Sequence, residues 1–104
     1  DDNFLSKMKN DAFLINTSRG DLVDNNALKN ALLKGEIAGA GLDVFTPEPL
    51  EKDNPLLDIK LKDKLILTPH IAGITHLTVE RIYKNILENT QNIINGRELK
   101  NKVN

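Results

Sequence analysis

The sequence contains no cysteine and no tryptophan, and aromatic residues make up only 4% of its 104 residues. The absence of cysteine excludes disulfides, thiolate metal ligands and a cysteine nucleophile, and it fits a reducing compartment. The two histidines, His70 and His76, are six residues apart, not the four of a helical metal pair, so we predict no metal site and no role for His76.

An excess of one charge and a long apolar run are also lacking. Lysine and arginine number 14 and aspartate and glutamate 15, which predicts no nucleic-acid or membrane-surface partner. No apolar run approaches the roughly 20 residues of a membrane span. The first residues, DDNFL, lack the features of a signal peptide and resemble the middle of a protein, so we expect a fragment.

Short apolar runs alternate with helical patterns along the chain. The expected elements are a helical turn at 4–10, strands at 12–17, 37–44 and 64–68, a helix between Asp24 and Gly35, an irregular stretch at 45–63 and a helix at 75–95. This alternation predicts an α/β fold with about three mainly parallel strands and flanking helices. We expect the first strand to be buried on both faces, because its run AFLI is continuously apolar.

Three polar residues follow or end the expected strands: Arg19, Asp43 and His70. Parallel sheets bind ligands beyond the carboxyl ends of their strands, so these side chains are expected at one edge. The planar fork of Arg19 suits a bidentate grip on a substrate carboxylate. Asp43 ends an apolar run and needs a partner if it is buried. Two interpretations stay open for it: an acceptor for a ligand amide such as a nicotinamide carboxamide, or a cap on a neighbouring loop.

Glu48 and His70 are the expected acid/base pair. Glu48 lies between Pro47 and Pro49, which limit where its carboxylate points, and His70 directly follows Pro69. Histidine suits general acid/base catalysis near neutral pH, and an adjacent glutamate fixes its tautomer.

Two apparent motifs are excluded. Gly39 and Gly41 begin a glycine pattern, but Val44 stands where the dinucleotide fingerprint has a third glycine. Ser18 lies in no nucleophile elbow. No segment of the sequence is suited to cradle the phosphates of a dinucleotide.

Four motifs together resemble one family: NTSRG at 16–20, GLDVF at 41–45, PEPL at 47–50 and TPHIAG at 68–73. In order and spacing they are similar to the C-terminal half of the D-isomer-specific 2-hydroxyacid dehydrogenases. The resemblance implies the C-terminal portion of a Rossmann-like, doubly wound parallel sheet. Residues 1–104 would then be a partial NAD-binding domain, with the glycine-rich loop and the substrate domain upstream. The helix 75–95 would pack toward that substrate domain.

The resemblance also implies roles for individual residues. Arg19 would bind the substrate carboxylate, and His70, paired with Glu48, would move the proton. The segments Thr17–Arg19 and His70–Gly73 would line the cofactor pocket. The implied cofactor-binding residues are Thr17, Ser18, Arg19, Asp43, His70, Ala72 and Gly73.

The implied protein is a cytoplasmic oxidoreductase, homodimeric at full length, that transfers hydride between NAD(H) and a small D-2-hydroxy or 2-oxo acid. NADP is an open alternative to NAD, and the fragment alone is expected to be inactive. Two other functions stay open. One is a non-catalytic relative that senses a dinucleotide or acts as a corepressor, and the other is a stand-alone three-strand α/β module with an unrelated binding role.

Overall fold

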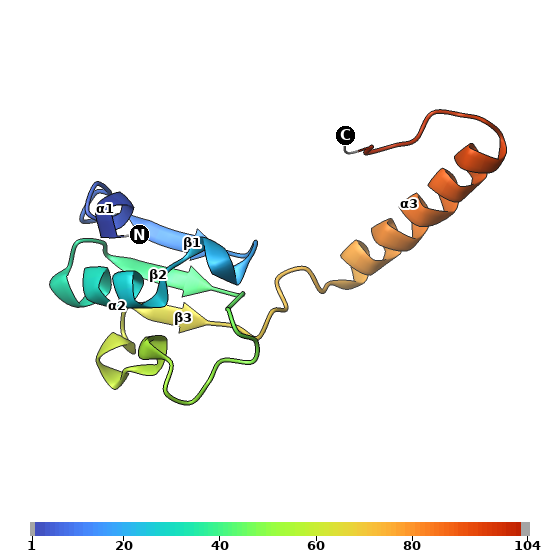
Figure 1. Cartoon of the computed structure of the whole chain (residues 1–104). Coiled ribbons are helices and arrows are strands. Elements are labelled where there is room, and N and C mark those ends of the chain that lie inside the picture. Colours follow the sequence, from blue (N-terminus) through green and yellow to red (C-terminus); the bar gives the residue numbers. More distant parts are fainter. Residues whose placement is uncertain (1, 103–104) are drawn as a thin grey trace. The chain divides into compact units, whose positions relative to one another are not determined.

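The computed structural model describes residues 2–102, which belong to two compact units, 1–72 and 73–104. The first unit contains a three-stranded sheet with helices, and the second contains one long helix (Figure 1). Each unit is described by itself.

The sheet of the first unit is parallel, as the sequence predicts. Strands β1 (Phe13–Asn16), β2 (Gly39–Leu42) and β3 (Leu65–Leu67) lie in the order β1-β2-β3, with Ile15 opposite Gly41 and Gly41 opposite Ile66. The three carboxyl ends therefore lie at one edge of the sheet (Figure 1).

Helix α2 (Asn25–Lys34) lies across one face of this sheet (Figure 1). Asp24 caps it, because its carboxylate accepts hydrogen bonds from the amides of Asn26 and Ala27, each at 3.0 Å. Gly35 ends it in the left-handed conformation, with φ of 71°. Both boundaries are those predicted. The buried face of α2 packs against Ala40 and Leu42 of β2, and the core comprises Leu5, Ala27, Leu28, Ala31, Leu32, Ile37, Ala40, Leu42, Leu56 and Leu61.

The expectation that the first strand is buried on both faces is wrong. Phe13 and Ile15 are each 67% exposed, and Ile66 of β3 is 70% exposed on the same face. Side chains alternate between the two faces of a strand, and α2 covers only one of them. No other helix described in residues 2–72 packs on the second face.

The connections also differ in detail from expectation. Helix α1 spans Asp2–Leu5, so the helical turn predicted at 4–10 lies too far along the chain; residues 6–12 instead form turns that lead into β1. A short 3-10 turn, η1 (Gly20–Leu22), follows β1. Two more, η2 (Pro55–Leu57) and η3 (Ile59–Leu61), interrupt the stretch predicted to be irregular. Leu56 and Leu61 anchor them against α2.

The second unit consists of helix α3 (His76–Ile94) and the segment after it. Thr75 caps the helix by accepting a hydrogen bond from the Thr78 amide, and Gly96 follows its end with φ of 63°. These boundaries agree with the predicted helix to within one residue at each end. Residues 98–100 fold back on α3 through hydrogen bonds to Asn89 and Asn92. None of the helices in residues 2–102 is long and apolar enough to cross a membrane.

Candidate active site at the carboxyl edge of the sheet

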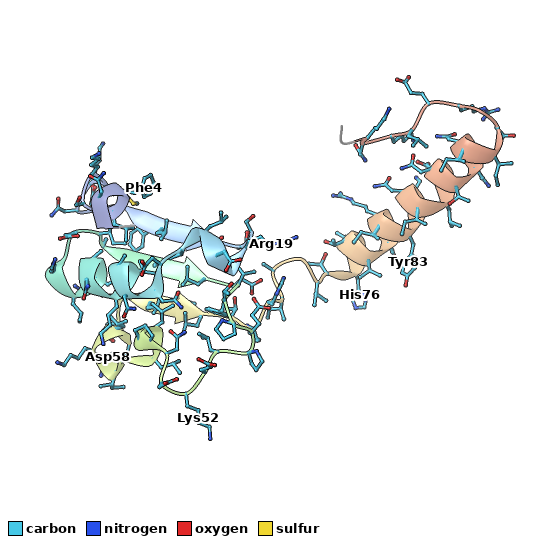
Figure 2. The ribbon with its side chains drawn as sticks, viewed as in Figure 1. Phe4, Arg19, Lys52, Asp58, His76 and Tyr83 are labelled. Atoms are coloured by element: carbon cyan, nitrogen blue, oxygen red, sulfur yellow. The ribbon has the colours of Figure 1, made fainter. Side chains whose placement is uncertain are left out.

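The polar residues predicted to meet at one edge do follow neighbouring strands. The ladder continues past the strands themselves, because the Asp43 amide donates to the Asn16 carbonyl at 3.0 Å. In the same way the Thr68 amide donates to the Leu42 carbonyl at 2.9 Å. Arg19, Asp43 and His70 are thus carried on adjacent turns of a single edge, and Figure 2 shows Arg19 there, beyond the end of β1.

Asp43 holds the turn that follows β3. It is only 3% exposed, and its Oδ1 accepts hydrogen bonds from the Thr68 hydroxyl and from the Ile71 amide at 2.9 Å. Its Oδ2 accepts one from the Ala72 amide at 2.8 Å. The Thr68 hydrogen bond, followed by those of the two amides, holds the pKa of Asp43 below its usual range although burial acts in the opposite direction. Of the two interpretations left open, the loop cap is therefore observed, and the contact with a ligand amide stays a prediction.

His70 lies at the tip of this turn in an uncommon backbone conformation. Its φ is 53°, in the left-handed region that few residues other than glycine adopt. Its amide donates to the Thr68 carbonyl at 3.0 Å, two residues back. The imidazole is 55% exposed and its Nδ1 lies 2.8 Å from Oε2 of Glu48. The predicted pairing of these two side chains is present.

Hydrogen bonds to both carboxylate oxygens orient the Glu48 side chain. Oε2 contacts His70, and Oε1 accepts a hydrogen bond from the Phe45 amide at 2.8 Å. The His70 hydrogen bond is the larger cause, and the Phe45 amide the second, of a pKa of Glu48 below its ordinary value. Because Nδ1 of His70 faces Glu48, Nε2 is the nitrogen left to meet a substrate.

Arg19 stands on a tightly closed turn. Oδ1 of Asn16 accepts a hydrogen bond from the Ser18 amide at 3.1 Å, and Nδ2 of Asn16 donates to the Arg19 carbonyl at 2.8 Å. The guanidinium is exposed, and its Nη1 donates to the Ser18 carbonyl at 2.7 Å. The structure therefore brings Glu48 and His70 into contact, whereas the Arg19 side chain folds onto its own turn.

Gly20 explains how the turn after β1 lies against the loop after β2. A Cβ atom at this position would lie 2.1 Å from the Phe45 carbonyl carbon and 2.6 Å from the Thr46 nitrogen. Only glycine permits this approach of one backbone to another. Through it, the turn carrying Arg19 touches the residue whose amide orients Glu48.

A pocket of about 540 Å³ opens beside the Glu48–His70 pair. Its walls are mostly apolar, as is typical of small-molecule sites with a few polar groups. The lining residues are Phe45, Glu48, Pro49, Leu50, Leu57, Leu67, Thr68, Pro69 and His70.

The remaining predicted cofactor contacts are exposed. Thr17 and Ser18 follow β1 at the carboxyl edge, and Ala72 ends the first unit. Gly73 begins the second unit, so its predicted contact stays a prediction.

Sequence reasoning missed two residues of this edge, Asn16 and Thr68. Asn16 is 6% exposed, and an amide that ends an apolar strand needs hydrogen-bond partners, which is the signal that could have identified it. Thr68 gives a weaker signal, because a threonine at the end of a strand is common.

A parallel α/β sheet with polar residues gathered at its carboxyl edge defines the class of ligand-binding α/β domains. Residues 1–72 match the family described as D-isomer specific 2-hydroxyacid dehydrogenase, NAD binding domain. The chain therefore belongs to this family, as its motifs indicate, and its sheet corresponds to part of the family's Rossmann domain.

Individual relatives agree with the family assignment. The glyoxylate/hydroxypyruvate reductase B of Cronobacter sakazakii is 47% identical over 98 residues, which are 94% of this chain and 29% of the relative. A D-isomer specific 2-hydroxyacid dehydrogenase from Xanthobacter autotrophicus Py2, crystallised with NADPH and MES, superposes with a TM-score of 0.83 at 36% identity. The match covers all of this chain and 41% of that one.

The D-lactate dehydrogenase of Lactobacillus jensenii, crystallised with NAD+, gives a TM-score of 0.74 at 34% identity, over 99% of this chain and 34% of that one. This chain is thus related to NAD(P)-dependent 2-hydroxyacid dehydrogenases and reductases, and it spans about 29% of the length of the reductase that it matches.

Proposed function

We propose that this chain is the C-terminal part of the NAD-binding domain of a longer oxidoreductase, which interconverts a small 2-oxo acid and a D-2-hydroxy acid. The observation that carries the proposal is the 2.8 Å contact between Glu48 and His70 at the carboxyl edge that also bears Arg19. The relatives are reductases and dehydrogenases of such acids, which supports the same substrate class.

The residues at this edge fit a nicotinamide cofactor. Thr17 and Ser18 offer exposed hydroxyls, and Oδ2 of Asp43 accepts only one hydrogen bond, so it keeps capacity for a carboxamide donor. When bound, the cofactor supplies the hydride. NAD is the proposed cofactor and NADP the alternative, since the related structures hold one or the other.

The proposed roles of the side chains follow from their positions. Arg19 leaves the Ser18 carbonyl and binds the substrate carboxylate through two parallel hydrogen bonds. Nε2 of His70 donates a proton to the substrate oxygen as negative charge develops there. Glu48 holds the imidazole at Nδ1 in the orientation that this donation needs. In the reverse direction the same nitrogen accepts the proton.

The test is the oxidation of NADH by the longer enzyme with glyoxylate, hydroxypyruvate and pyruvate. We expect Arg19→Ala to raise KM about tenfold to a hundredfold, because it removes charge-assisted hydrogen bonds to the substrate. We expect His70→Ala to lower kcat by about 10²–10⁴-fold. Arg81→Ala, in α3, is the matched control for loss of an arginine.

Unchanged kinetics in both the Arg19 and His70 variants would refute the proposed roles. Tight binding of NADH without turnover of any 2-oxo acid would instead support the dinucleotide-sensing alternative.

A further inference from the structure

Only two buried polar or charged residues are found in the part of the chain that the structure describes, Asn16 and Asp43. Both lie at the carboxyl edge of the sheet, and neither leaves a buried side-chain polar atom without a partner. Burying a polar group costs free energy unless the group is hydrogen-bonded. Once it is hydrogen-bonded, a buried polar group makes the segments that carry its partners more rigid. Here the partners belong to the two turns that carry Arg19 and His70.

Asn16 closes the turn of Arg19 from within. Its side chain accepts from the Ser18 amide and donates to the Arg19 carbonyl, so it binds the backbone on both sides of the Ser18–Arg19 peptide. Such a side chain limits the backbone dihedral angles of Ser18 and Arg19, and hence the direction in which the guanidinium leaves the chain.

Thr68 acts on the turn of His70 through Asp43. Its hydroxyl donates to Oδ1 of Asp43, and that carboxylate accepts from the amides of Ile71 and Ala72 on the far side of His70. Residues on both sides of His70 are thus hydrogen-bonded to the Asp43 carboxylate. Such an arrangement can hold the histidine at its φ of 53°.

We propose that Asn16 and Thr68 are positioning residues for the reaction: Asn16 sets the direction of Arg19, and Thr68, through Asp43, sets His70 against Glu48. The inference rests on the proposed function for its kinetic consequences, and it has structural consequences that do not depend on turnover. Since Arg19 would bind substrate and His70 would transfer a proton, the two residues affect different kinetic constants.

The kinetic test compares variants in the longer enzyme. Thr68→Val exchanges the hydroxyl for a methyl group, and we expect kcat to fall by up to about 100-fold with KM little changed, because His70 is displaced. Thr68→Ser restores the hydroxyl and is expected to recover most of kcat. Thr90→Val, which removes a hydroxyl bonded only to the Ile86 carbonyl within α3, is the control.

Asn16→Ala is expected to raise KM by about tenfold with the smaller effect on kcat, because the Arg19 turn loses the two hydrogen bonds that the Asn16 side chain makes to it. Asn10→Ala is the matched control, since Asn10 donates to the Gly35 carbonyl at 3.3 Å but lies outside the site.

Amide hydrogen exchange of this chain gives the second readout. In Thr68→Val we expect faster exchange at Ile71 and Ala72, with the amides of α2 unchanged. In Asn16→Ala we expect faster exchange at Ser18 alone. If Thr68→Val fails to fold, Thr68→Cys takes its place, because it replaces the hydroxyl by a weaker S–H donor.

Two results would overturn the inference. One is unchanged exchange at Ile71 and Ala72 in a folded Thr68→Val chain, and the other is an equal effect of the Asn16 and Thr68 variants on both kinetic constants. A longer enzyme without turnover, combined with the expected exchange pattern, would remove the proposed function but keep the positioning of the two turns.

Discussion

At the scale of single residues, the site depends on two carboxylates, those of Glu48 and Asp43. Every oxygen of both groups accepts a hydrogen bond that orients it. Each oxygen of Glu48 has its own donor, one from His70 and one from the Phe45 backbone. Asp43 combines one hydroxyl and two amides from the turn after β3. The direction of each carboxylate is therefore set before any ligand arrives, which is the preorganisation that proton transfer needs.

The Glu48–His70 contact gives a prediction for low pH. Because the folded-state pKa of Glu48 lies below its ordinary value of 4.5, its contribution to stability is fully present above about pH 4.5 and is lost as the pH falls through the folded-state value. We expect His70→Ala to raise the pKa of Glu48 toward 4.5. A carbon-13 NMR titration of the Glu48 carboxyl group measures both values, and identical values in the two chains would contradict the contact.

The sequence alone identifies the charged and titratable residues of the candidate site. Arg19, Asp43 and His70 each follow a predicted strand, so the parallel topology was enough to place them at one edge. Asn16 and Thr68 are neutral, and their importance lies in hydrogen bonds to backbone groups that only the folded turns bring within reach. The left-handed backbone conformation of His70 could not be predicted from the sequence either, since a histidine does not require it.

At the scale of elements, the approach of two loops fixes the edge of the sheet. The turn after β1 contacts the loop after β2 at Gly20, where an added Cβ would overlap the backbone of Phe45. Loops usually tolerate substitution. Here, however, the contact is between backbone atoms, so no flexible side chain can move aside to make room for a Cβ atom.

Gly20→Ala is therefore expected to destabilise the chain by about 1–3 kcal/mol through overpacking, and to shift the amide resonance of Thr46, whose nitrogen the added Cβ would approach. Thermal denaturation and a proton–nitrogen correlation spectrum measure the two effects. Gly73→Ala is the control, because a Cβ there has no atom within 4 Å. Equal melting temperatures for the two variants would show that the Gly20 contact is absent in solution.

Helix α2 is the element on which the core of the first unit depends. Leu28 is fully buried between the helix and the sheet, so Leu28→Ala is expected to lower the free energy of unfolding by about 2–5 kcal/mol. Leu33→Ala, on the same helix but 42% exposed, is the control and should change it far less. Urea denaturation followed by circular dichroism gives both values, and similar losses would contradict the orientation of the helix.

The predictability of these elements follows from how local their signals are. Asp24 and Gly35 bound α2 by contacts within a few residues, so its limits were predicted well. The exposure of Phe13 and Ile15 depends on which faces the rest of the fold covers, and no local pattern reports that. The same apolar run is consistent with a strand that is buried on one face and with a strand that is buried on both.

At the scale of the whole molecule, each unit exposes apolar surface. The sheet of the first unit exposes Phe13, Ile15 and Ile66. Helix α3 of the second unit has no buried residue, and its apolar stripe includes Val79, Ile82, Tyr83, Ile86 and Leu87, all exposed. Figure 2 shows the Tyr83 side chain projecting from this helix. Apolar patches of this kind are characteristic of surfaces that are covered in an assembly.

We therefore expect the chain, produced by itself, to self-associate as its concentration rises. Replacing Ile82 and Ile86 together by glutamine should shift sedimentation equilibrium toward the monomer. Lys84→Gln, a substitution on the polar side of the same helix, should leave the distribution unchanged. A wild-type chain that stays monomeric across the concentration range would contradict this prediction.

The left-handed backbone at His70 restricts which residues can succeed the histidine in evolution. Asparagine, aspartate and glycine adopt such a conformation most readily, whereas branched side chains do so at a high energetic cost. A single exchange of His70 for asparagine would thus remove the imidazole and leave the surrounding loop in place. If His70 has the proposed role, this one substitution would leave a protein that keeps the fold of the site and loses the proton-transferring group.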